Sequence, residues 1–184
     1  FENHNNEWQK GLLQFICTDP FFYRKQAITK YLALWIPMFE FPLVIPNDSE
    51  IAENERGIEM GRRSESLIVN VVNEGHDTTG MLITFKALAN IKNPSLFNIN
   101  TREQLKINVD MQAGDIIQVN TKNREKYARM IKDNGTETNV FNLLDINSTF
   151  LQLEVGDNYF RFNAEQGIDY LEVSMTFNPK FIGI

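Results

Sequence analysis

The clearest chemical candidate lies in the stretch FICTDPFFYRKQ, which spans residues 15–26 and holds the chain's only cysteine. Cys17 stands two residues before Asp19, so one interpretation is a thiol nucleophile with a carboxylate beside it. A catalytic thiol needs a neighbouring base or a helix N-terminus to lower its pKa. The chain has only two histidines, and no helix pattern follows the cysteine, which argues against this chemistry.

The other interpretation of Cys17 is structural. Leu13, Phe15 and Cys17 alternate along the chain and would share one face of a strand. Cysteine is among the residues most often buried, where it behaves as a small hydrophobe. We favour this interpretation: a buried strand enters a turn at Asp19-Pro20, and the aromatic residues 21–23 anchor the next strand.

The two histidines are far apart in the sequence. His4 lies in the polar segment ENHNNE, where we expect it to be solvated. His76 lies in NEGHDTTG beside Asp77, which could form a site on a loop. We favour a simple hairpin loop there, in which Gly75 and Gly80 supply unusual backbone dihedrals. Because two separated histidines and one cysteine make a poor ligand set, we expect no metal and no cofactor.

Other catalytic signatures are missing from the sequence. Glycoside hydrolysis needs two facing carboxylates, which a sequence cannot pair. The segment GDIIQVN leads into a strand pattern rather than a helix, so it is no phosphate-binding loop, and no Gly-x-Ser-x-Gly elbow is present. We therefore expect no enzymatic activity, and we assign no catalytic, cofactor, metal or ligand-binding residues.

Aromatic side chains offer a different chemistry, which is stacking on sugar rings. Trp8, Trp35 and Tyr159 could do this if exposed, and Tyr159 alternates away from Phe160 and Phe162. The same residue types are also favoured at protein interfaces. The sequence leaves both possibilities open.

The elements that must position these residues are strands. Period-2 alternation of apolar residues recurs about every ten residues, with turn signals between the segments, which is typical of an antiparallel sandwich or barrel. We therefore predict an all-β fold, an antiparallel β-sandwich of the galectin-like or jelly-roll-like kind. The alternating segments cover residues 67–73, 81–87, 105–111, 115–120, 151–155, 159–164 and 171–177.

The connectors carry turn chemistry. Asn134-Gly135, Gly114-Asp115 and Gly156-Asp157 each predict a tight hairpin turn, since Asn and Gly tolerate positive φ. We expect the charged segment 47–66 to form a long, mobile loop. With no internal boundary, we predict a single domain over residues 1–184, in which 1–12 form a linker or a strand from a preceding domain.

Composition restricts the partners. The formal net charge is -6, and Lys and Arg are not clustered, so we expect no nucleic-acid binding. The most apolar run, YLALWIPMFEFPLVIP, is interrupted by three prolines and a glutamate, so we expect no membrane span. A single cysteine excludes an internal disulfide.

The order of the motifs resembles the phage distal tail protein family, the siphovirus-type tail component, and within it the C-terminal domain. The resemblance extends from about Leu13 to Ile184. The segments that carry it are FICTDPFFY, FEFPLVIP, NEGHDTTGMLITF, IKNPSLFNINTREQLKINVDMQAGDIIQVNT, NGTETNVFNLLDINSTFLQLEVGDNYFRF and VSMTFNPKFIGI. Its strongest points are Asp19-Pro20, Asn93-Pro94, Gly114-Asp115, Ser148–Phe150 with Gly156 and Asn158, and the terminal Phe181–Ile184.

This resemblance implies a galectin-like β-sandwich and a structural role at the tail tip, in the distal tail or baseplate hub of a phage or prophage. The implied partners are other tail proteins: the tail tube, the tape measure, and a tail-tip or receptor-binding protein. A preceding domain, which we expect to be absent from this chain, would form a ring, typically a hexamer. The implied location is the virion tail tip, after synthesis in the bacterial host cytoplasm.

A carbohydrate-binding module for host cell-surface glycans is the alternative function. The galectin sugar site uses a tryptophan followed by glutamate, together with a His-Asn-Arg cluster. In this sequence Trp35 is followed by Ile36, and no strand pattern places a histidine near an arginine. The sequence therefore departs from the galectin sugar site, and we place the tail-protein role first.

Overall fold

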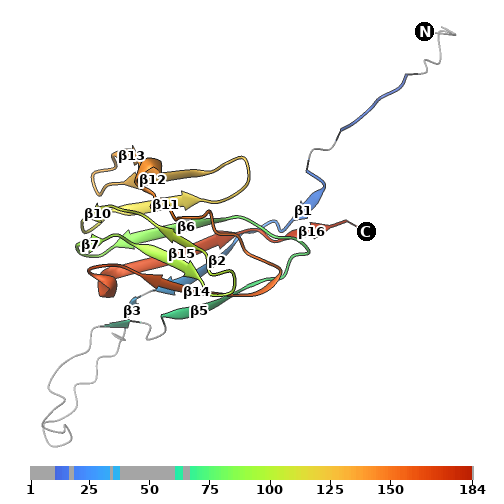
Figure 1. The fold of residues 1–184 in the computed structure, drawn as a ribbon. Helices are drawn as coiled ribbons and strands as arrows, with labels where there is room; N and C mark the ends of the chain where they lie inside the picture. The colour runs from blue at the N-terminus through green and yellow to red at the C-terminus, as the bar shows by residue number, and fades with distance from the viewer. Residues whose placement is uncertain (1–10, 17–18, 34, 38–60, 64–66, 184) are drawn as a thin grey trace, which may run out of the picture.

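The computed structural model describes residues 11–16, 19–33, 35–37, 61–63 and 67–183. Two antiparallel sheets pack into a β-sandwich, and short strand pairs extend its ends (Figure 1). This confirms the predicted all-β fold. The helical content of the described residues consists of short 3₁₀ turns at Phe141–Leu143 and Ile168–Tyr170.

The larger sheet has six strands, and two of its interior strands, β6 and β15, are paired along their whole length. One edge strand, β2, carries a bulge opposite Val173 and Ser174, so that the consecutive residues Leu32 and Ala33 are both buried. In spatial order the strands are β13 (Glu137–Asn139), β12 (Tyr127–Ile131), β11 (Ile116–Asn120), β6 (Met81–Ala87), β15 (Leu171–Phe177) and β2 (Ile28–Ala33).

The smaller sheet has four strands in the order β5 (Ile68–Asn73), β14 (Gly156–Asn163), β8 (Ser95–Asn98) and β9 (Gln104–Lys106). Three two-stranded pairs complete the described fold. They are β1 (Phe21–Tyr23) with β16 (Lys180–Ile182), β7 (Ile91–Lys92) with β10 (Asp110–Met111), and β3 (Trp35–Pro37) with β4 (Gly61–Arg63).

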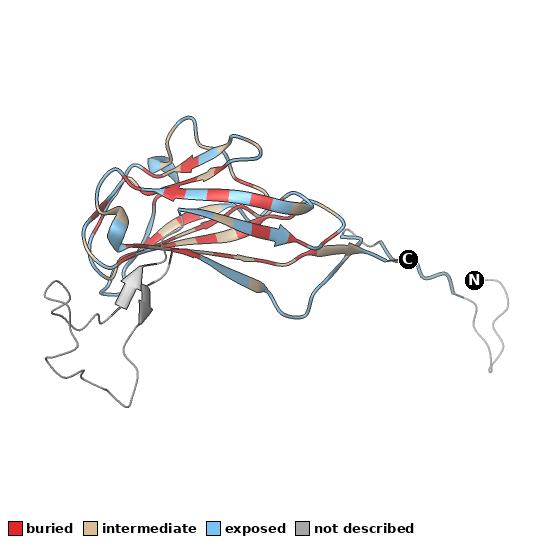
Figure 2. Ribbon diagram, turned by 90° about the horizontal axis from the view of Figure 1, so that it is seen from below, coloured by how far each residue is buried: buried red, intermediate tan, exposed pale blue. Residues whose placement is uncertain are grey.

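The core lies between the inner faces of the two sheets, as the red segments of Figure 2 show. Every second residue of β6 and of β15 is buried, and the intervening residues lie toward solvent. The four-stranded sheet contributes Val71, Leu96, Phe160 and Phe162 to the same core. This alternation follows from the pleat of a strand, which sends successive side chains to opposite faces.

Most of the predicted strands are confirmed, and two differ. Residues 105–111 form two short strands, because the Asn108 N–H leaves the ladder and donates to the Leu143 carbonyl at 2.8 Å. Residues 151–155 have the predicted burial at Leu151 and Leu153 but pair only through an isolated bridge between Thr79 and Leu153. There the Glu154 N–H donates to the Asn158 side chain instead of to a neighbouring strand.

The predicted strand before the Asp19-Pro20 turn is wrong over its described part. Residues 11–16 belong to no strand and are exposed; Leu13 is 82% and Phe15 is 88% accessible. Cys17 itself lies outside the described residues. Alternation alone does not make a strand, because a strand also needs a ladder partner and a core to face. The strand predicted over 21–23 is confirmed as β1.

The three predicted turns have the expected positive φ at glycine, but only one of them joins two paired strands. Asn134-Gly135 forms the hairpin between β12 and β13, with Gly135 at φ 81°. Gly114 has φ 88° and Gly156 has φ 90°, but neither joins two paired strands. Their flanking strands belong to different sheets or pairs, because a sandwich needs connections that cross between its layers. Of the predicted loop 47–66, residues 61–63 form strand β4, and the remainder lies outside the described residues.

Candidate functional site

A terminal arm projects from one end of the sandwich, and it is made of β1 and β16. The two strands pair antiparallel, with Phe21 opposite Ile182 and Tyr23 opposite Lys180. Figures 1 and 2 both place this arm at the end where the C-terminus lies and from which the described residues 11–16 extend. The arm therefore gathers the described N-terminal residues and the C-terminal strand at one end of the sandwich.

The Asp19-Pro20 turn starts the arm. The Asp19 carboxylate accepts a hydrogen bond from the Phe21 N–H at 3.3 Å and from the Tyr23 hydroxyl at 2.8 Å. Burial raises the pKa of Tyr23, and the hydrogen bond and negative charge of Asp19 raise it further, as does the charge of Asp77. Asp19 thus acts as the acceptor that fixes this turn.

His76 and Asp77 hold the other strand of the arm. The backbone N–H of His76 donates to the Lys180 carbonyl at 2.7 Å. The Nδ1 atom of the His76 ring accepts a hydrogen bond from the Ile182 N–H at 3.4 Å. Its ring also meets that of Phe181 edge to face, with 5.5 Å between the centroids. The Asp77 carboxylate lies 3.3 Å from the Lys180 ammonium. The sequence placed His76 in a hairpin loop, but this segment crosses from β5 in one sheet to β6 in the other.

The two glycines of this crossing segment allow close approach between backbones. A Cβ atom on Gly75 would lie 2.7 Å from the Lys180 carbonyl oxygen, and one on Gly80 would lie 2.5 Å from the Lys122 Cα. Neither glycine is among the residues with positive φ. The expected role as suppliers of unusual dihedrals is therefore wrong. They are glycines because β16 and the β11–β12 turn pack directly against them.

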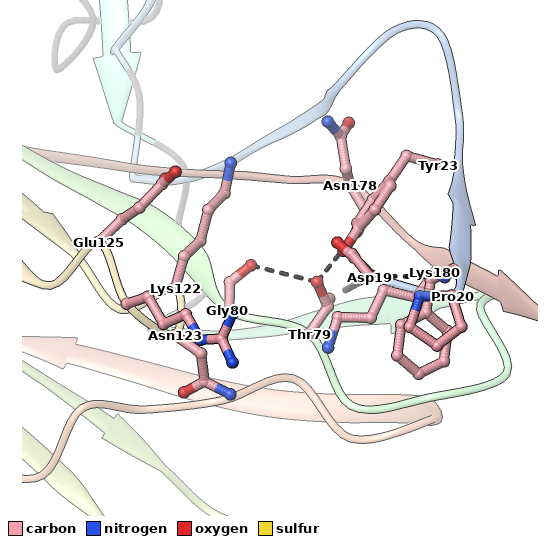
Figure 3. Close-up of a pocket in the computed structure, with 12 residues that line it drawn as sticks. Asp19, Pro20, Tyr23, Thr79, Gly80, Lys122, Asn123, Glu125, Asn178 and Lys180 are labelled. Atoms are coloured by element: carbon pink, nitrogen blue, oxygen red, sulfur yellow. Dashed lines mark hydrogen bonds between the residues drawn. The ribbon is translucent and has the colours of Figure 1, made fainter. Parts of the chain in front are cut away.

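Between the arm and the β11–β12 turn lies a pocket of about 490 Å³ (Figure 3). Figure 3 places Lys122 and Glu125 on one side of it and Asp19, Pro20 and Tyr23 on the other. Thr79 lies at its base, where its hydroxyl bonds to the Asn178 carbonyl at 2.9 Å. The remaining lining residues are Phe21, Gly80, Asn123, Arg124, Asn178 and Lys180.

The pocket brings charged and polar groups together. Lys180 is neutralised by Asp77, and its ammonium also lies 5.1 Å from the centre of the Phe21 ring. No cluster of potential metal ligands occurs among the described residues. The charged and polar lining of this pocket suits non-covalent binding of a polar or charged group.

A second polar cluster surrounds Lys106. Its ammonium donates to the Glu165 carboxylate at 2.7 Å, and the Asn93 amide donates to the same carboxylate at 2.9 Å. The hydrogen bond from Lys106 is the largest cause that lowers the pKa of Glu165, and the bond from Asn93 is the next. The pKa of Asp145 is also lowered, first by the hydrogen bond from the Asn147 backbone N–H and then by that from the Asn108 amide. A general acid in glycoside hydrolysis needs a raised pKa. These two carboxylates therefore do not suit that role.

The aromatic candidates are separated from the pocket. Tyr159 lies on β14, where it is 42% exposed on the face opposite the buried Phe160 and Phe162, as predicted. Trp35 lies in β3, but its side chain is outside the described part, as are His4 and Trp8.

The sequence analysis did not single out the pocket residues Lys122 and Arg124, whose only local signal was the turn composition between two strands. Within the described residues, no helix is long and apolar enough to cross a membrane.

Comparison with known proteins identifies the family. A search of curated proteins found no match. Among solved structures, the chain resembles SPP1 Dit, described as a paradigm of the hub adsorption apparatus in phages that infect Gram-positive bacteria. The TM-score is 0.56 and the identity 15%, over 90% of this chain and 50% of the SPP1 chain, so this likeness concerns the fold. Residues 74–181, more than half of the sequence, match the siphovirus-type tail component, C-terminal domain. The chain therefore belongs to this family of phage tail components.

Proposed function

We infer that the chain is an attachment domain at the tip of a phage or prophage tail, where it binds neighbouring tail proteins without catalysis. The observation that carries this proposal is the family match over 74–181, together with a fold shared with a hub protein over 90% of the chain. The terminal arm adds support, since it leads away from the sandwich at one end.

The length comparison supports a proposal for the wider assembly. This chain spans about half of the SPP1 Dit chain that it resembles. In our proposal, the other half of a full-length protein forms a ring, with six copies as the expected number. The sandwich then points outward toward a tail-tip or receptor-binding protein, while the ring contacts the tail tube and the tape measure.

The decisive experiment uses the full-length protein. Light scattering measures its mass, and negative-stain images of the same sample show its shape. A closed ring of several subunits, six in the expected case, supports the hub proposal. A monodisperse monomer, together with absence of the protein from purified tails, contradicts it. Release of fragments from purified peptidoglycan by the protein would contradict the non-catalytic part.

Glycan binding is a second candidate function, and the exposure of Tyr159 favours it. The ring lies on the outer face of the four-stranded sheet, next to polar groups. The amide of Asn70 donates to Asp157 at 2.6 Å, and Arg161 lies over the Phe97 ring at 5.7 Å. A glycan array tests this function, with Tyr159→Ala as the site variant and Tyr170→Ala, a 48% exposed tyrosine on a 3₁₀ turn, as the control. Binding that survives Tyr159→Ala would place the sugar site elsewhere.

A further inference from the structure

Two side-chain cations on the β11–β12 turn, Lys122 and Arg124, have no partner among the described residues. Lys122 is half-buried and Arg124 is exposed, and both line the pocket at the base of the arm. Neither side chain makes an ion pair or hydrogen bond with any part of the chain that the structure describes, whereas Lys180 across the pocket is paired with Asp77. The Glu125 carboxylate on the same turn is also unpaired within the described residues. The unpaired side chains of the pocket therefore carry one net positive charge, in a chain whose net charge is -6.

The turn that carries these cations is held firmly in place. The Lys122 N–H donates to the Asn120 side chain at 3.2 Å, and the Glu125 N–H closes the turn on the Lys122 carbonyl at 3.2 Å. Gly80 lets the Lys122 backbone lie directly against the start of β6. Arg124 has φ 68°, a left-handed conformation that is unfavourable for a residue with a side chain. A strained residue held on a rigid turn at a pocket is a recurring sign of a binding site, because the group is positioned before the ligand arrives.

The opposite wall determines which ligand suits the pocket. Pro20 and Phe21 offer apolar surface there, and Asp19 is already bonded to Tyr23 and to the backbone. A guanidinium recognises a carboxylate through two parallel hydrogen bonds, and an ammonium adds a point charge. A volume of about 490 Å³ is within the range of small-ligand sites and takes one acidic side chain with the short backbone that carries it.

We propose that this pocket binds a Glu or Asp side chain of a neighbouring tail protein, with Arg124 and Lys122 as the cation partners and Pro20 and Phe21 as the apolar wall. The choice of a protein partner rests on the proposed function, since a tail component works by contact with other tail proteins. A neighbour of different sequence is favoured over a second copy because the unpaired side chains of the pocket carry a net positive charge, which suits an acidic surface.

The test is zero-length crosslinking in assembled tails that contain the full-length protein. A carbodiimide activates a carboxylate, which then forms an amide bond with a lysine amine in contact with it, with loss of water. Mass spectrometry of the digested tails should find a peptide containing Lys122 joined to a Glu or Asp of another tail protein. Lys132, an exposed lysine in the β12–β13 hairpin away from the pocket, is the internal control and should give no such product.

Charge variants then test the pocket itself. Arg124→Gln should lower the yield of the Lys122 crosslink about tenfold, the effect of losing one charge-assisted hydrogen-bonded pair. Arg102→Gln is the matched control, because Arg102 is also an exposed arginine with positive φ (59°) but lies between β8 and β9. The yield of the Lys122 crosslink in Arg102→Gln should equal that in the unchanged protein.

The outcomes separate the two proposals. If the protein is absent from tails, the proposed function fails. If it is present but Lys122 joins only to Glu125 of its own chain, to a second copy, or to nothing, the pocket proposal alone is overturned. Equal crosslinking of Lys122 and Lys132 to many partners would also overturn it, since general surface charge would then explain the contact.

Discussion

The Nδ1 atom of His76 accepts a hydrogen bond from the backbone N–H of Ile182, 106 residues further along the chain, at 3.4 Å. A side chain on the segment that joins the two sheets thereby holds the last strand of the terminal arm. Because residues of the arm also line the pocket, this contact links the position of the arm to the shape of the candidate site.

Substitution of His76 by alanine should loosen the arm while the sandwich stays folded. It removes one hydrogen bond and the edge-to-face contact with Phe181. Amide hydrogen exchange at Ile182 should become about tenfold faster, the effect of losing roughly 1.4 kcal/mol of local stability. Arg24→Ala is the control, because the Arg24–Glu74 pair is exposed and contributes little. Unchanged exchange at Ile182 in His76→Ala would show that this contact does not hold the strand.

The alternation of β14 predicts that substitutions on its two faces change the free energy of unfolding by very different amounts. Phe162 is 1% exposed, so Phe162→Ala should leave a cavity and lower the free energy of unfolding by about 3–5 kcal/mol. Tyr159→Ala, on the other face of the same strand, should change it by no more than about 1 kcal/mol. Urea denaturation of both variants measures the difference. Equal losses would mean that the two faces of β14 are wrongly assigned.

Gly80→Ala should destabilise the protein through a backbone clash. The added methyl group would lie 2.5 Å from the Lys122 Cα, so the β11–β12 turn must move, at a cost of about 1–3 kcal/mol. The amide resonance of Lys122 should shift in a ¹⁵N spectrum. Gly135→Ala is an informative comparison, since φ is 81° there but no atom lies within 4 Å. It should lose about 1–2 kcal/mol from strain alone and leave the Lys122 resonance unchanged.

Arg124→Gly should make the protein more stable. Glycine adopts φ near 68° without steric cost, so relief of strain should add roughly 1 kcal/mol to the free energy of unfolding. Arg102→Gly, at φ 59°, should behave similarly. Thermal unfolding of the two variants checks the prediction. A loss of stability in Arg124→Gly would mean that the arginine side chain stabilises the turn and does not merely tolerate it.

The Lys106–Glu165 contact predicts a pH dependence. Because Lys106, then Asn93, lowers the pKa of Glu165, the stabilisation is present above the ordinary glutamate pKa and is lost as pH falls through the lowered value. Lys106→Gln should raise the pKa of Glu165 toward its ordinary value in an NMR titration of the carboxyl carbon. Lys86→Gln, which removes a different ion pair, with Glu172, should leave it unchanged. An unaltered Glu165 pKa in Lys106→Gln would exclude the hydrogen bond as the main cause.

The sequence by itself determined which residues of β6 and β15 face the core. Met81, Phe85, Val173 and Phe177 are buried where the period-2 pattern placed them, because the pleat of a strand depends only on local backbone geometry. It also determined the family, through the order of its motifs. It missed β12, since Ala128 and Met130 face the core there while the apolar Tyr127 and Ile131 lie on the other face, so no period-2 alternation appears.

Only the tertiary structure decided which segments pair and where the pocket lies. Leu13 and Phe15 alternate as well as any confirmed strand does. They are nevertheless exposed, because no strand in the described part of the chain pairs with them and its core does not cover them. The pocket joins residues from β1, the start of β6, the β11–β12 turn and β16. Local sequence does not predict that these residues lie together. Strand pairing and sheet packing bring residues more than 100 positions apart into contact, and each depends on partners elsewhere in the chain.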